Sequence, residues 1–387
     1  MINLTALCCG ASFYGDSLRY SSPSRGAHAG TTSRQGPVVA WNCTRRCNQN
    51  CVHCYMEANS QGDEQELDSR EARKFSDDLA AFGVPVLLLS GGEPLMREDF
   101  WDLAGHAIEK GIRVTISTNG TLITPSVARD MKKLGISYVG ISLDGVEDTH
   151  DSFRDSPGAF NRTLESLRYC REAGQKVGLR FTLTRRNYRD LGEVLRLVEE
   201  EDIPRVCFYH LVFAGRGKDL KEEMIPHEVT REIINHLIES TERFYNQGKQ
   251  KEILTVDNHA DGVYLYLQLL RKDPDWAEQV RQMLEHNGGN RSGIAIGAVD
   301  PKGGVHPDQF SQDQLLGNIR EKPFSRLWTQ GTPLLHKLRQ RKPYLKGRCG
   351  SCRWLSMCNG NLRARAYASC GDFWAEDPGC YLGSDLT

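Results

Sequence analysis

Short apolar segments alternate with longer amphipathic segments between residues 38 and 212. The apolar segments have the length and composition of strands and lie at 38–42, 86–89, 113–118, 138–143, 177–183 and 206–212. The segments between them have helical periodicity and lie at 69–83, 99–110, 125–134, 158–173 and 188–201. Short strands that alternate with helices are typical of βαβ units, which build a parallel sheet buried on both faces. We therefore predict an α/β fold, an open partial (β/α)6 barrel, with its chemistry at the carboxyl ends of the strands.

The regions that flank this alternation have a different character. Residues 1–36 are rich in Gly, Ser and Arg, lack sustained periodicity, and are expected to form an extension that lies over the body. Residues 222–290 are charged and are expected to be a mostly helical bridge, whereas 291–387 are Gly-rich and contain few long helices. We expect four parts: the extension 1–36, the barrel 37–221, the helical bridge 222–290 and a small cysteine-rich domain 291–387.

The composition excludes several classes of function. Hydrophobic residues make up 39% of the chain and charged residues 26%, which is ordinary for a globular protein and tells against disorder. Lys+Arg 49 against Asp+Glu 50 leaves a net charge of −1, so no basic excess indicates nucleic acid or anionic lipid. No apolar run approaches the ~18 residues that span a bilayer, and the N-terminal MINLTALCCG lacks the features of a signal peptide. We expect a cytoplasmic protein with no nucleic-acid or membrane partner.

The 13 cysteines are unusual for such a chain, and eight of them lie in two groups. The groups are Cys43, Cys47, Cys51 and Cys54 near the start, and Cys349, Cys352, Cys358 and Cys380 near the end. A long chain without an export signal is not expected to be a disulfide protein. Clustered thiols in such a chain indicate metal or iron–sulfur chemistry instead.

Three cysteines of the first group, Cys47, Cys51 and Cys54, form a C-x3-C-x2-C pattern directly after the first predicted strand. Three thiolates can hold three irons of a [4Fe–4S] cluster and leave the fourth iron open to a substrate or cofactor. A structural zinc loop is the alternative, with Cys43 or His53 as its fourth ligand. Cys43 itself is more simply interpreted as a buried strand cysteine.

This pattern resembles the signature of the radical S-adenosylmethionine (radical SAM) enzymes, and motifs at the following strand ends agree with it. SGGEP (90–94) follows the second predicted strand, STNG (117–120) ends the third, and SLDG (142–145) ends the fourth. The resemblance implies that Cys47, Cys51 and Cys54 hold the cluster. It also implies contacts to S-adenosylmethionine from Gly91, Gly92, Glu93, Asn119, Ser142, Asp144 and Arg154.

The roles of these residues follow from the same resemblance. The GGEP stretch would receive the amino group of the cofactor, Ser142 and Arg154 would hold its carboxylate, and Asp144 would lie near its ribose. A carboxylate favours the donor fork of a guanidinium, which suits Arg154. His53 occupies a position where the family often has an aromatic residue beside the adenine.

The second cysteine group offers four thiolates and therefore a closed site. The spacing of Cys349, Cys352, Cys358 and Cys380 resembles the SPASM and Twitch extensions of radical SAM enzymes, which implies one auxiliary [4Fe–4S] cluster. The upstream stretch 293–310 contains no cysteine, so a second auxiliary cluster is not expected, and His306 and Asp308 are expected to be surface turn residues rather than unusual ligands. A structural zinc ion, or Cys370 in place of Cys380, is left open.

Segments along nearly the whole chain resemble the radical SAM enzymes that remove side chains from tetrapyrroles. The segments are GDSLRY (15–20), GPVVAWNCTRRCN (36–48), FYHLVFAGRG (208–217), VDNHADGVYL (256–265), VHPDQF (305–310) and GDFWAEDPGCYL (371–382). Of these enzymes, the deacetylases of 12,18-didecarboxysiroheme in the siroheme-dependent haem pathway are favoured over those of haem d1 synthesis. A peptide-modifying SPASM maturase is a further alternative, but residues 1–36 lack the pattern of a peptide-binding segment.

The resemblance implies the following reaction. A ferredoxin or flavodoxin reduces the first cluster, S-adenosylmethionine yields a 5′-deoxyadenosyl radical, and acetate side chains leave didecarboxysiroheme to give iron-coproporphyrin III. An anionic tetrapyrrole needs cationic partners. Candidates are Arg180, Arg185, Arg186, Arg216, Arg363 and Arg365. His210 and His259 are candidates to ligate the substrate iron or to move a proton, although a packed histidine is the simpler interpretation of each.

Overall fold

The strands form one continuous sheet in the computed structural model, which describes residues 1–13, 15–20 and 36–383. They are β1 (Ile2–Asn3), β2 (Val38–Thr44), β3 (Val86–Gly91), β4 (Arg113–Thr118), β5 (Tyr138–Ser142), β6 (Val177–Leu183), β7 (Arg205–His210), β8 (Glu252–Val256), β9 (Ile296–Val299), β10 (Gly304–His306) and β11 (Gly317–Asn318). Their order across the sheet is β1-β8-β7-β6-β5-β4-β3-β2-β9-β10-β11. Neighbours from β8 to β9 are parallel, and the pairs β1–β8, β9–β10 and β10–β11 are antiparallel.

The predicted α/β fold is confirmed. The six predicted strands are β2 to β7, and the bounds of β4 and β6 match the prediction residue for residue. Strand β8 was not predicted and lies within the segment that we expected to be helical. Its five residues are all buried between β7 and β1, so they extend the parallel sheet by one strand.

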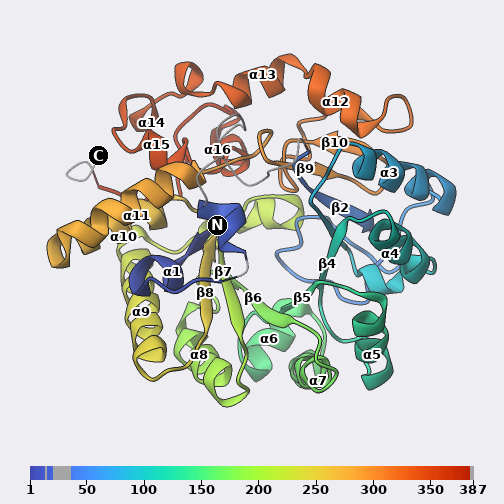
Figure 1. Cartoon of the computed structure of the whole chain (residues 1–387), viewed down its shortest axis with the longest axis horizontal. Helices are drawn as coiled ribbons and strands as arrows, with labels where there is room; N and C mark the ends of the chain where they lie inside the picture. The colour runs from blue at the N-terminus through green and yellow to red at the C-terminus, as the bar shows by residue number, and fades with distance from the viewer. Residues whose placement is uncertain (14, 21–35, 384–387) are drawn as a thin grey trace.

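Amphipathic helices surround the strands (Figure 1). They are α3 (Ser69–Ala81), α4 (Phe100–Glu109), α5 (Pro125–Leu134), α6 (Glu147–Arg154), α7 (Ala159–Glu172), α8 (Leu191–Glu200) and α9 (His227–Asn246), with the 3-10 turns η1 (Pro94–Met96), η2 (Tyr188–Asp190) and η3 (Gly215–Glu223). Helix α8 illustrates the amphipathic pattern, with an apolar face that is buried. Its buried residues stand at helical spacing; they are Leu191, Val194, Leu195 and Val198. Helix α5 begins with a Thr124 cap and Pro125 and ends at Gly135 in the left-handed conformation, as the sequence pattern predicts.

The described part of the N-terminal extension is folded onto the barrel. Strand β1 pairs with β8, and the helices α1 (Leu4–Cys9) and α2 (Asp16–Tyr20) follow it. Helix α1 packs against α9, and the Asn3 amide donates a 2.8 Å hydrogen bond to the Tyr20 hydroxyl. Most of the Gly- and Ser-rich part of the predicted extension, 21–35, lies outside the described residues. The extension therefore completes one edge of the sheet.

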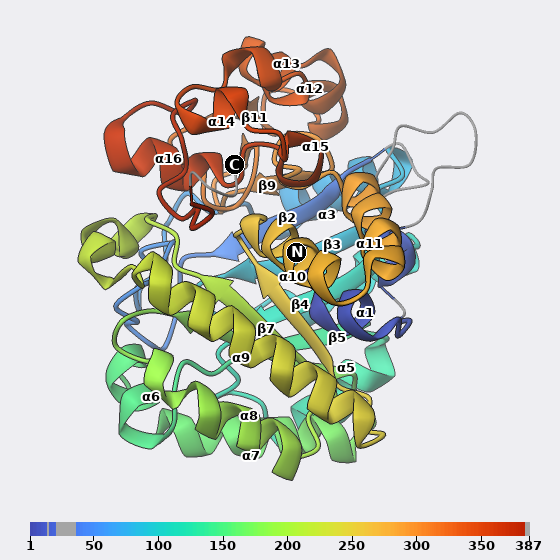
Figure 2. The same ribbon diagram turned by 90° about the vertical axis from the view of Figure 1, so that its left-hand side faces the viewer.

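The C-terminal part lies on one side of the barrel (Figures 1 and 2). Its helices are α10 (Ala260–Lys272), α11 (Pro274–Asn287), α12 (Phe324–Gln330), α13 (Pro333–Arg339), α14 (Arg348–Ser351), α15 (Leu355–Cys358) and α16 (Arg363–Cys370), with the turn η4 (Lys342–Tyr344). Strands β9 to β11 connect this part to the barrel, because β9 pairs with β2. Among the described residues, no helix combines the length and the apolar composition that crossing a membrane requires.

The expectation that His306 and Asp308 are surface turn residues was wrong, because both are buried. His306 lies in β10, the middle strand of the three antiparallel strands β9, β10 and β11, and its Nε2 is 3.1 Å from Asp300 Oδ2. Asp308 accepts hydrogen bonds from the amides of Phe310 and Ser311. The Pro- and Asp-containing segment 305–310 suggested an exposed turn. Strand β10 pairs with β9 on one side and β11 on the other, so His306 and the residues after it are buried, and local hydrogen bonds satisfy part of their polar groups.

Candidate functional site

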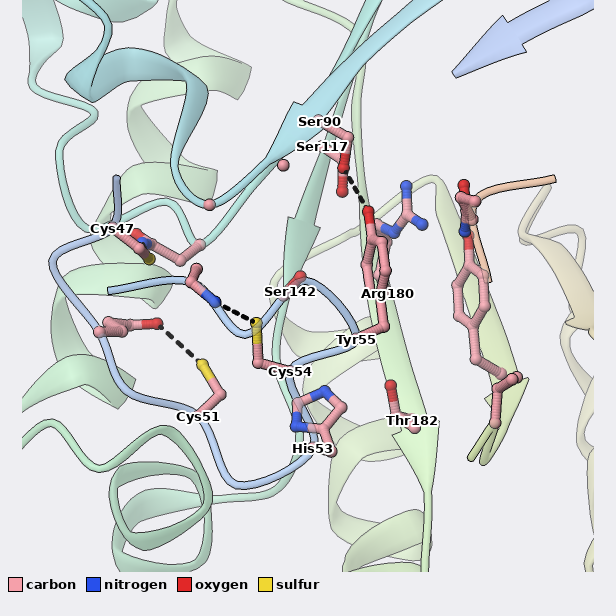
Figure 3. A pocket seen from close by; sticks show the side chains of 18 of the residues that line it. Cys47, Cys51, His53, Cys54, Tyr55, Ser90, Ser117, Ser142, Arg180 and Thr182 are labelled. Carbon is pink, nitrogen blue, oxygen red and sulfur yellow. Dashed lines mark hydrogen bonds between the residues drawn. The ribbon is translucent and has the colours of Figure 1, made fainter. Parts of the chain in front are cut away.

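A cavity lies at the carboxyl ends of the parallel strands (Figure 3). Each strand from β2 to β8 contributes a lining residue at or just after its carboxyl end, as βα architectures predict. The loop after β2 provides Cys47, Cys51 and Cys54, and the ends of the next strands provide the polar motifs. The fold therefore brings residues that are far apart in the sequence, such as Cys47 and Asp257, to the same cavity.

The cysteine loop is fixed by hydrogen bonds to its backbone. The Cys47 amide donates to the Asn59 carbonyl at 2.7 Å, and the Cys54 amide donates to the Cys51 carbonyl at 3.3 Å. Arg216 donates from Nε to the Cys51 carbonyl at 2.9 Å and from Nη1 to the Ala58 carbonyl at 2.8 Å. Arg216, predicted as a substrate contact, thus braces the loop that carries the three cysteines.

Each sulfur of the loop accepts a hydrogen bond. Asn119 Nδ2 lies 3.9 Å from Cys47 Sγ, Arg154 Nη1 lies 3.4 Å from Cys51 Sγ, and the Ala58 amide lies 3.5 Å from Cys54 Sγ. Such donors stabilise thiolates that bind metal. Burial raises the pKa of the Cys47 thiol to about 12, so a cation is required to keep it ionised at neutral pH.

The three thiols of the loop line the same cavity. Within the described residues, no three His, Cys, Asp or Glu side chains are placed to hold one metal ion. A four-iron cluster binds each thiolate through a different iron, so its ligands surround a common space rather than one point. Gln49 Nε2 and Arg154 Nε are buried beside this loop without a hydrogen-bond partner in the described structure. A polar group bound in the cavity would satisfy such atoms.

The SGGEP motif shapes the wall next to the cysteine loop. Gly91 has φ of +127°, and a Cβ on Gly92 would lie 2.3 Å from the Arg46 carbonyl oxygen. The Glu93 carboxylate is fully buried and accepts hydrogen bonds from the Thr118 hydroxyl, at 2.8 Å, and the Asn119 amide, also at 2.8 Å. Burial raises the pKa of Glu93 to about 7. Glu93 therefore ties the end of β3 to the end of β4 rather than lining the cavity.

Replacement of Gly92 by alanine is expected to disrupt the cysteine loop. The new methyl group meets backbone, which cannot rotate away, so we expect a loss of stability of about 1–3 kcal/mol and impaired cluster binding. Unfolding in denaturant and the iron content would measure both. Gly192→Ala is the matched control, because nothing lies within 4 Å of its added Cβ in α8, and it should stabilise by about 0.4–1 kcal/mol. Equal stability and equal iron content of the two variants would contradict the role of Gly92 in shaping the cysteine loop.

The residues expected at the carboxylate and the ribose of the cofactor separate into two kinds, and the expectation that Asp144 reaches the ribose is not met by its position. Ser142 and Arg154 line the cavity, whereas Asp144 is fully buried behind them. Asp144 forms an ion pair with Arg154 and accepts a 2.6 Å hydrogen bond from the Thr182 amide. The Arg154 guanidinium and the Thr182 amide keep the pKa of Asp144 below its usual value despite burial, which raises it. Asp144 thus holds Arg154 in position.

His53 lies beside the same pair. Its ring contacts Phe153 with centroids 4.5 Å apart, and its Nε2 is 3.7 Å from Asp144 Oδ2. Burial lowers the pKa of His53 to about 4, so its imidazole is neutral at physiological pH. A neutral flat ring that lines the cavity suits stacking, in agreement with the position at which the family has an aromatic residue.

The other candidate substrate contacts differ in position. Arg180 and His210 line the cavity, and His210 Nε2 lies 2.9 Å from Asp261 Oδ2. His259 does not line the cavity. Its ring is buried elsewhere, and its Nε2 lies 3.3 Å from the Met1 amino group. The remaining candidate arginines have partners within the protein; they are Arg185, Arg186, Arg363 and Arg365.

A second, small cavity is lined by the four cysteines of the C-terminal group, Cys349, Cys352, Cys358 and Cys380. The Trp354 amide donates to Cys352 Sγ at 3.4 Å, and burial raises the pKa of Cys380 to about 11. Cys370 is exposed on α16 and is not among the lining residues, so the geometry favours Cys380 as the fourth thiol. Four thiols around one space fit a closed cluster site.

Of the polar residues in the main cavity that sequence reasoning did not single out, such as Tyr55 and Tyr209, the acidic one is Asp257. It directly follows β8, and because this strand was not predicted, Asp257 was not expected at the end of a strand. The signal was present: EILTV is a short run with β-branched residues that ends at Asp257 and Asn258, as a strand followed by a turn does. The VDNHADG segment was singled out for His259, which lies outside the cavity.

Comparison with known proteins agrees with this geometry. The model of the Radical SAM superfamily matches residues 41–198. Fe-coproporphyrin III synthase of Methanosarcina barkeri is 49% identical over 99% of this chain and 98% of that protein. Pre-heme d1 synthase of Dinoroseobacter shibae is 42% identical over 96% of this chain and 91% of that protein. The crystal structure of Streptococcus suis SuiB bound to S-adenosylmethionine has a similar fold, with a TM-score of 0.70 at 18% identity over 89% of this chain and 77% of that one.

Proposed function

The chain belongs to the radical SAM superfamily, and from this membership we propose that it removes acetate side chains from 12,18-didecarboxysiroheme to give iron-coproporphyrin III. The observation that carries the proposal is the 49% identity to Fe-coproporphyrin III synthase over nearly the full length of both chains. Side-chain removal in haem d1 synthesis is the second candidate, supported by 42% identity over somewhat less of each chain.

The superfamily uses a [4Fe–4S] cluster and S-adenosylmethionine, which supply one-electron chemistry able to open a C–H bond when they are bound. In our proposal Cys47, Cys51 and Cys54 hold the cluster. Gly91, Gly92 and Asn119, with Ser142 and Arg154, line the space for S-adenosylmethionine, and Glu93 and Asp144 position them from behind. The guanidinium of Arg154 offers donors to a carboxylate.

The second cysteine group is proposed to hold one auxiliary [4Fe–4S] cluster. Cys349, Cys352, Cys358 and Cys380 line one cavity, and four thiolates leave no iron open for substrate. We further propose a cytoplasmic location and a ferredoxin or flavodoxin as the electron donor, since the first cluster requires a strong one-electron reductant.

An anaerobic assay tests the proposed reaction. Reconstituted, reduced protein is incubated with S-adenosylmethionine and 12,18-didecarboxysiroheme, and the tetrapyrrole is analysed by mass spectrometry. We expect the loss of two acetate-derived units together with formation of 5′-deoxyadenosine. Formation of 5′-deoxyadenosine with an unchanged tetrapyrrole would reject this substrate, and the haem d1 precursor and a peptide would be assayed next.

A further inference from the structure

One part of the main cavity carries two charged side chains that have no use in holding the cluster. Arg180 lies in β6, in register with Ser142 of β5 and Cys207 of β7, and Asp257 follows β8. Figure 3 shows Arg180 on its strand, apart from the loop that carries Cys47 and Cys51. These two residues belong to the half of the barrel that follows the S-adenosylmethionine motifs in sequence.

Arg180 is a cation without an anionic partner in the described structure. Its guanidinium carbon lies 4.7 Å from the centroid of the Tyr209 ring, and it forms neither a hydrogen bond nor an ion pair with a described side chain. The buried arginines elsewhere have acceptors, such as Asp144 for Arg154 and Asp377 for Arg365. An unpaired cation removed from bulk water is costly, and an anionic ligand would offset that cost.

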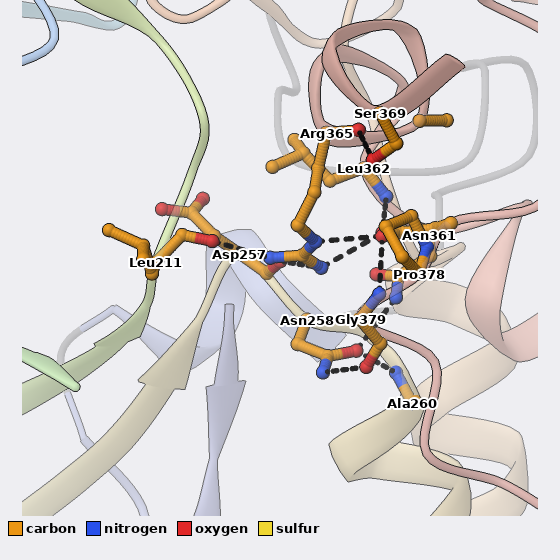
Figure 4. A network of polar contacts seen from close by, with 12 residues as sticks. Leu211, Asp257, Asn258, Ala260, Asn361, Leu362, Arg365, Ser369, Pro378 and Gly379 are labelled. Atoms are coloured by element: carbon orange, nitrogen blue, oxygen red, sulfur yellow. Dashed lines mark hydrogen bonds and ion pairs between the residues drawn. The ribbon is translucent and has the colours of Figure 1, made fainter. Parts of the chain in front are cut away.

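Asp257 is the corresponding unpaired acid. Its Oδ2 is buried without a hydrogen-bond partner in the described part of the chain. Its backbone has φ of +65°, a conformation that is uncommon outside glycine and that clusters at functional sites. Arg365 stabilises this conformation, because Nη2 donates to the Asp257 carbonyl at 3.0 Å and Nη1 donates to the Leu211 carbonyl at 3.1 Å (Figure 4).

We propose that Arg180 and Asp257 form a binding subsite for a carboxylate of the tetrapyrrole. The charges of the two side chains interact, but no ion pair joins them, so a group that bridges both would complete the hydrogen bonding. A substrate carboxylate does so: it accepts from the Arg180 guanidinium and from the protonated Asp257 carboxyl group. The subsite rests on the proposed function, since it takes the ligand to be a tetrapyrrole with several carboxylates.

The proposed role of Asp257 makes ligand binding depend on pH. Burial and the nearby Asp308 raise the pKa of Asp257 to about 6, against the Met1 amino group, Arg365 and Arg180, which lower it. Below this pKa the carboxyl group is neutral and donates a hydrogen bond to the ligand. Above it Asp257 is anionic and repels a carboxylate, so affinity should fall as the pH rises through about 6.

Binding of iron-coproporphyrin III and of its tetramethyl ester, followed by absorbance titration, tests the subsite. For Arg180→Gln we expect about 10- to 100-fold weaker binding of the acid, from the energy of hydrogen bonds to charged groups, and unchanged binding of the ester. Arg196→Gln is the matched control, because Arg196 is exposed on α8 and pairs with Glu193 of the same helix. The iron content of each variant checks that both cysteine sites are intact.

The second arm tests Asp257. The wild type should bind the acid more weakly at pH 7.5 than at pH 5.5, and Asp257→Asn should lose this dependence while keeping the affinity found at pH 5.5. Asp130→Asn, an exposed change on α5, should retain the wild-type pH dependence.

Equal affinity of Arg180→Gln and wild type for the acid would overturn the subsite. Failure of the wild type to bind either tetrapyrrole would instead reject the proposed function.

Discussion

Replacement of Cys51 by alanine is expected to abolish the formation of 5′-deoxyadenosine and to remove about four irons per chain. The thiol has no substitute nearby, because Cys43 is buried in β2 and does not line the cavity. The second cysteine group should keep its own iron, so half of the visible absorbance of the reconstituted protein should remain. Iron and sulfide analysis, together with chromatography of the nucleoside product, would measure the effect.

Two further variants control this result. Cys370→Ser should change neither the iron content nor the nucleoside product, because Cys370 is exposed and outside both cavities. Cys352→Ala should remove the complementary half of the iron, since Cys352 lines the second cavity. Retention of all iron after Cys51→Ala would show that the first site is assigned to the wrong cysteines.

Replacement of Asp377 by alanine is expected to destabilise the protein by about 3–5 kcal/mol, because it leaves a buried guanidinium unpaired. Asp377 accepts from Arg365 Nε at 2.7 Å and from Nη2 at 2.8 Å, and it also accepts from the Leu362 amide at 3.0 Å. Both side chains of the pair are almost completely buried. The midpoint of unfolding in denaturant would measure the loss.

A surface pair provides the comparison. Lys346 and Asp372 lie 2.7 Å apart, but their side chains are 64% and 34% exposed, so Asp372→Ala should lower the unfolding midpoint far less than Asp377→Ala. Similar midpoints for the two variants would mean that Arg365 finds other acceptors when Asp377 is lost.

Periodicity and spacing predicted most of the barrel, because most of its helices and strands show their own pattern; the short helix α6 (Glu147–Arg154) was not predicted. Helix α5 has a threonine cap, a proline at its first position and a glycine after its end, and its predicted bounds are those observed. Strand β6 likewise matches, since its sequence VGLRFTL is mostly apolar or β-branched and stands between polar turns. Strand β8 was missed because its five residues stand inside a charged segment whose long helical patterns dominate the window around them.

The side-chain positions in the site were less predictable, since motif residues differ in what they face. SGGEP and SLDG were found from the sequence, but Glu93 and Asp144 turn away from the cavity to support their neighbours. A linear pattern does not distinguish a residue that touches a ligand from one that positions it. Asp257 shows the reverse case: it lines the cavity although it was not a candidate, and its place depends on the register of β8 beside β7.

The pairing of β1 with β8 links Ile2 to Thr255, so the first strand finds its partner only after two-thirds of the chain has been made. During synthesis the N-terminal segment must wait, and the strands β2 to β7 can assemble before it joins. Until then the buried edge of β7 has no neighbour and exposes its backbone hydrogen-bonding groups to other chains. The opposite edge, β2, stays open longer still, because its partner β9 begins only at Ile296, so both edges of the sheet are closed late in synthesis.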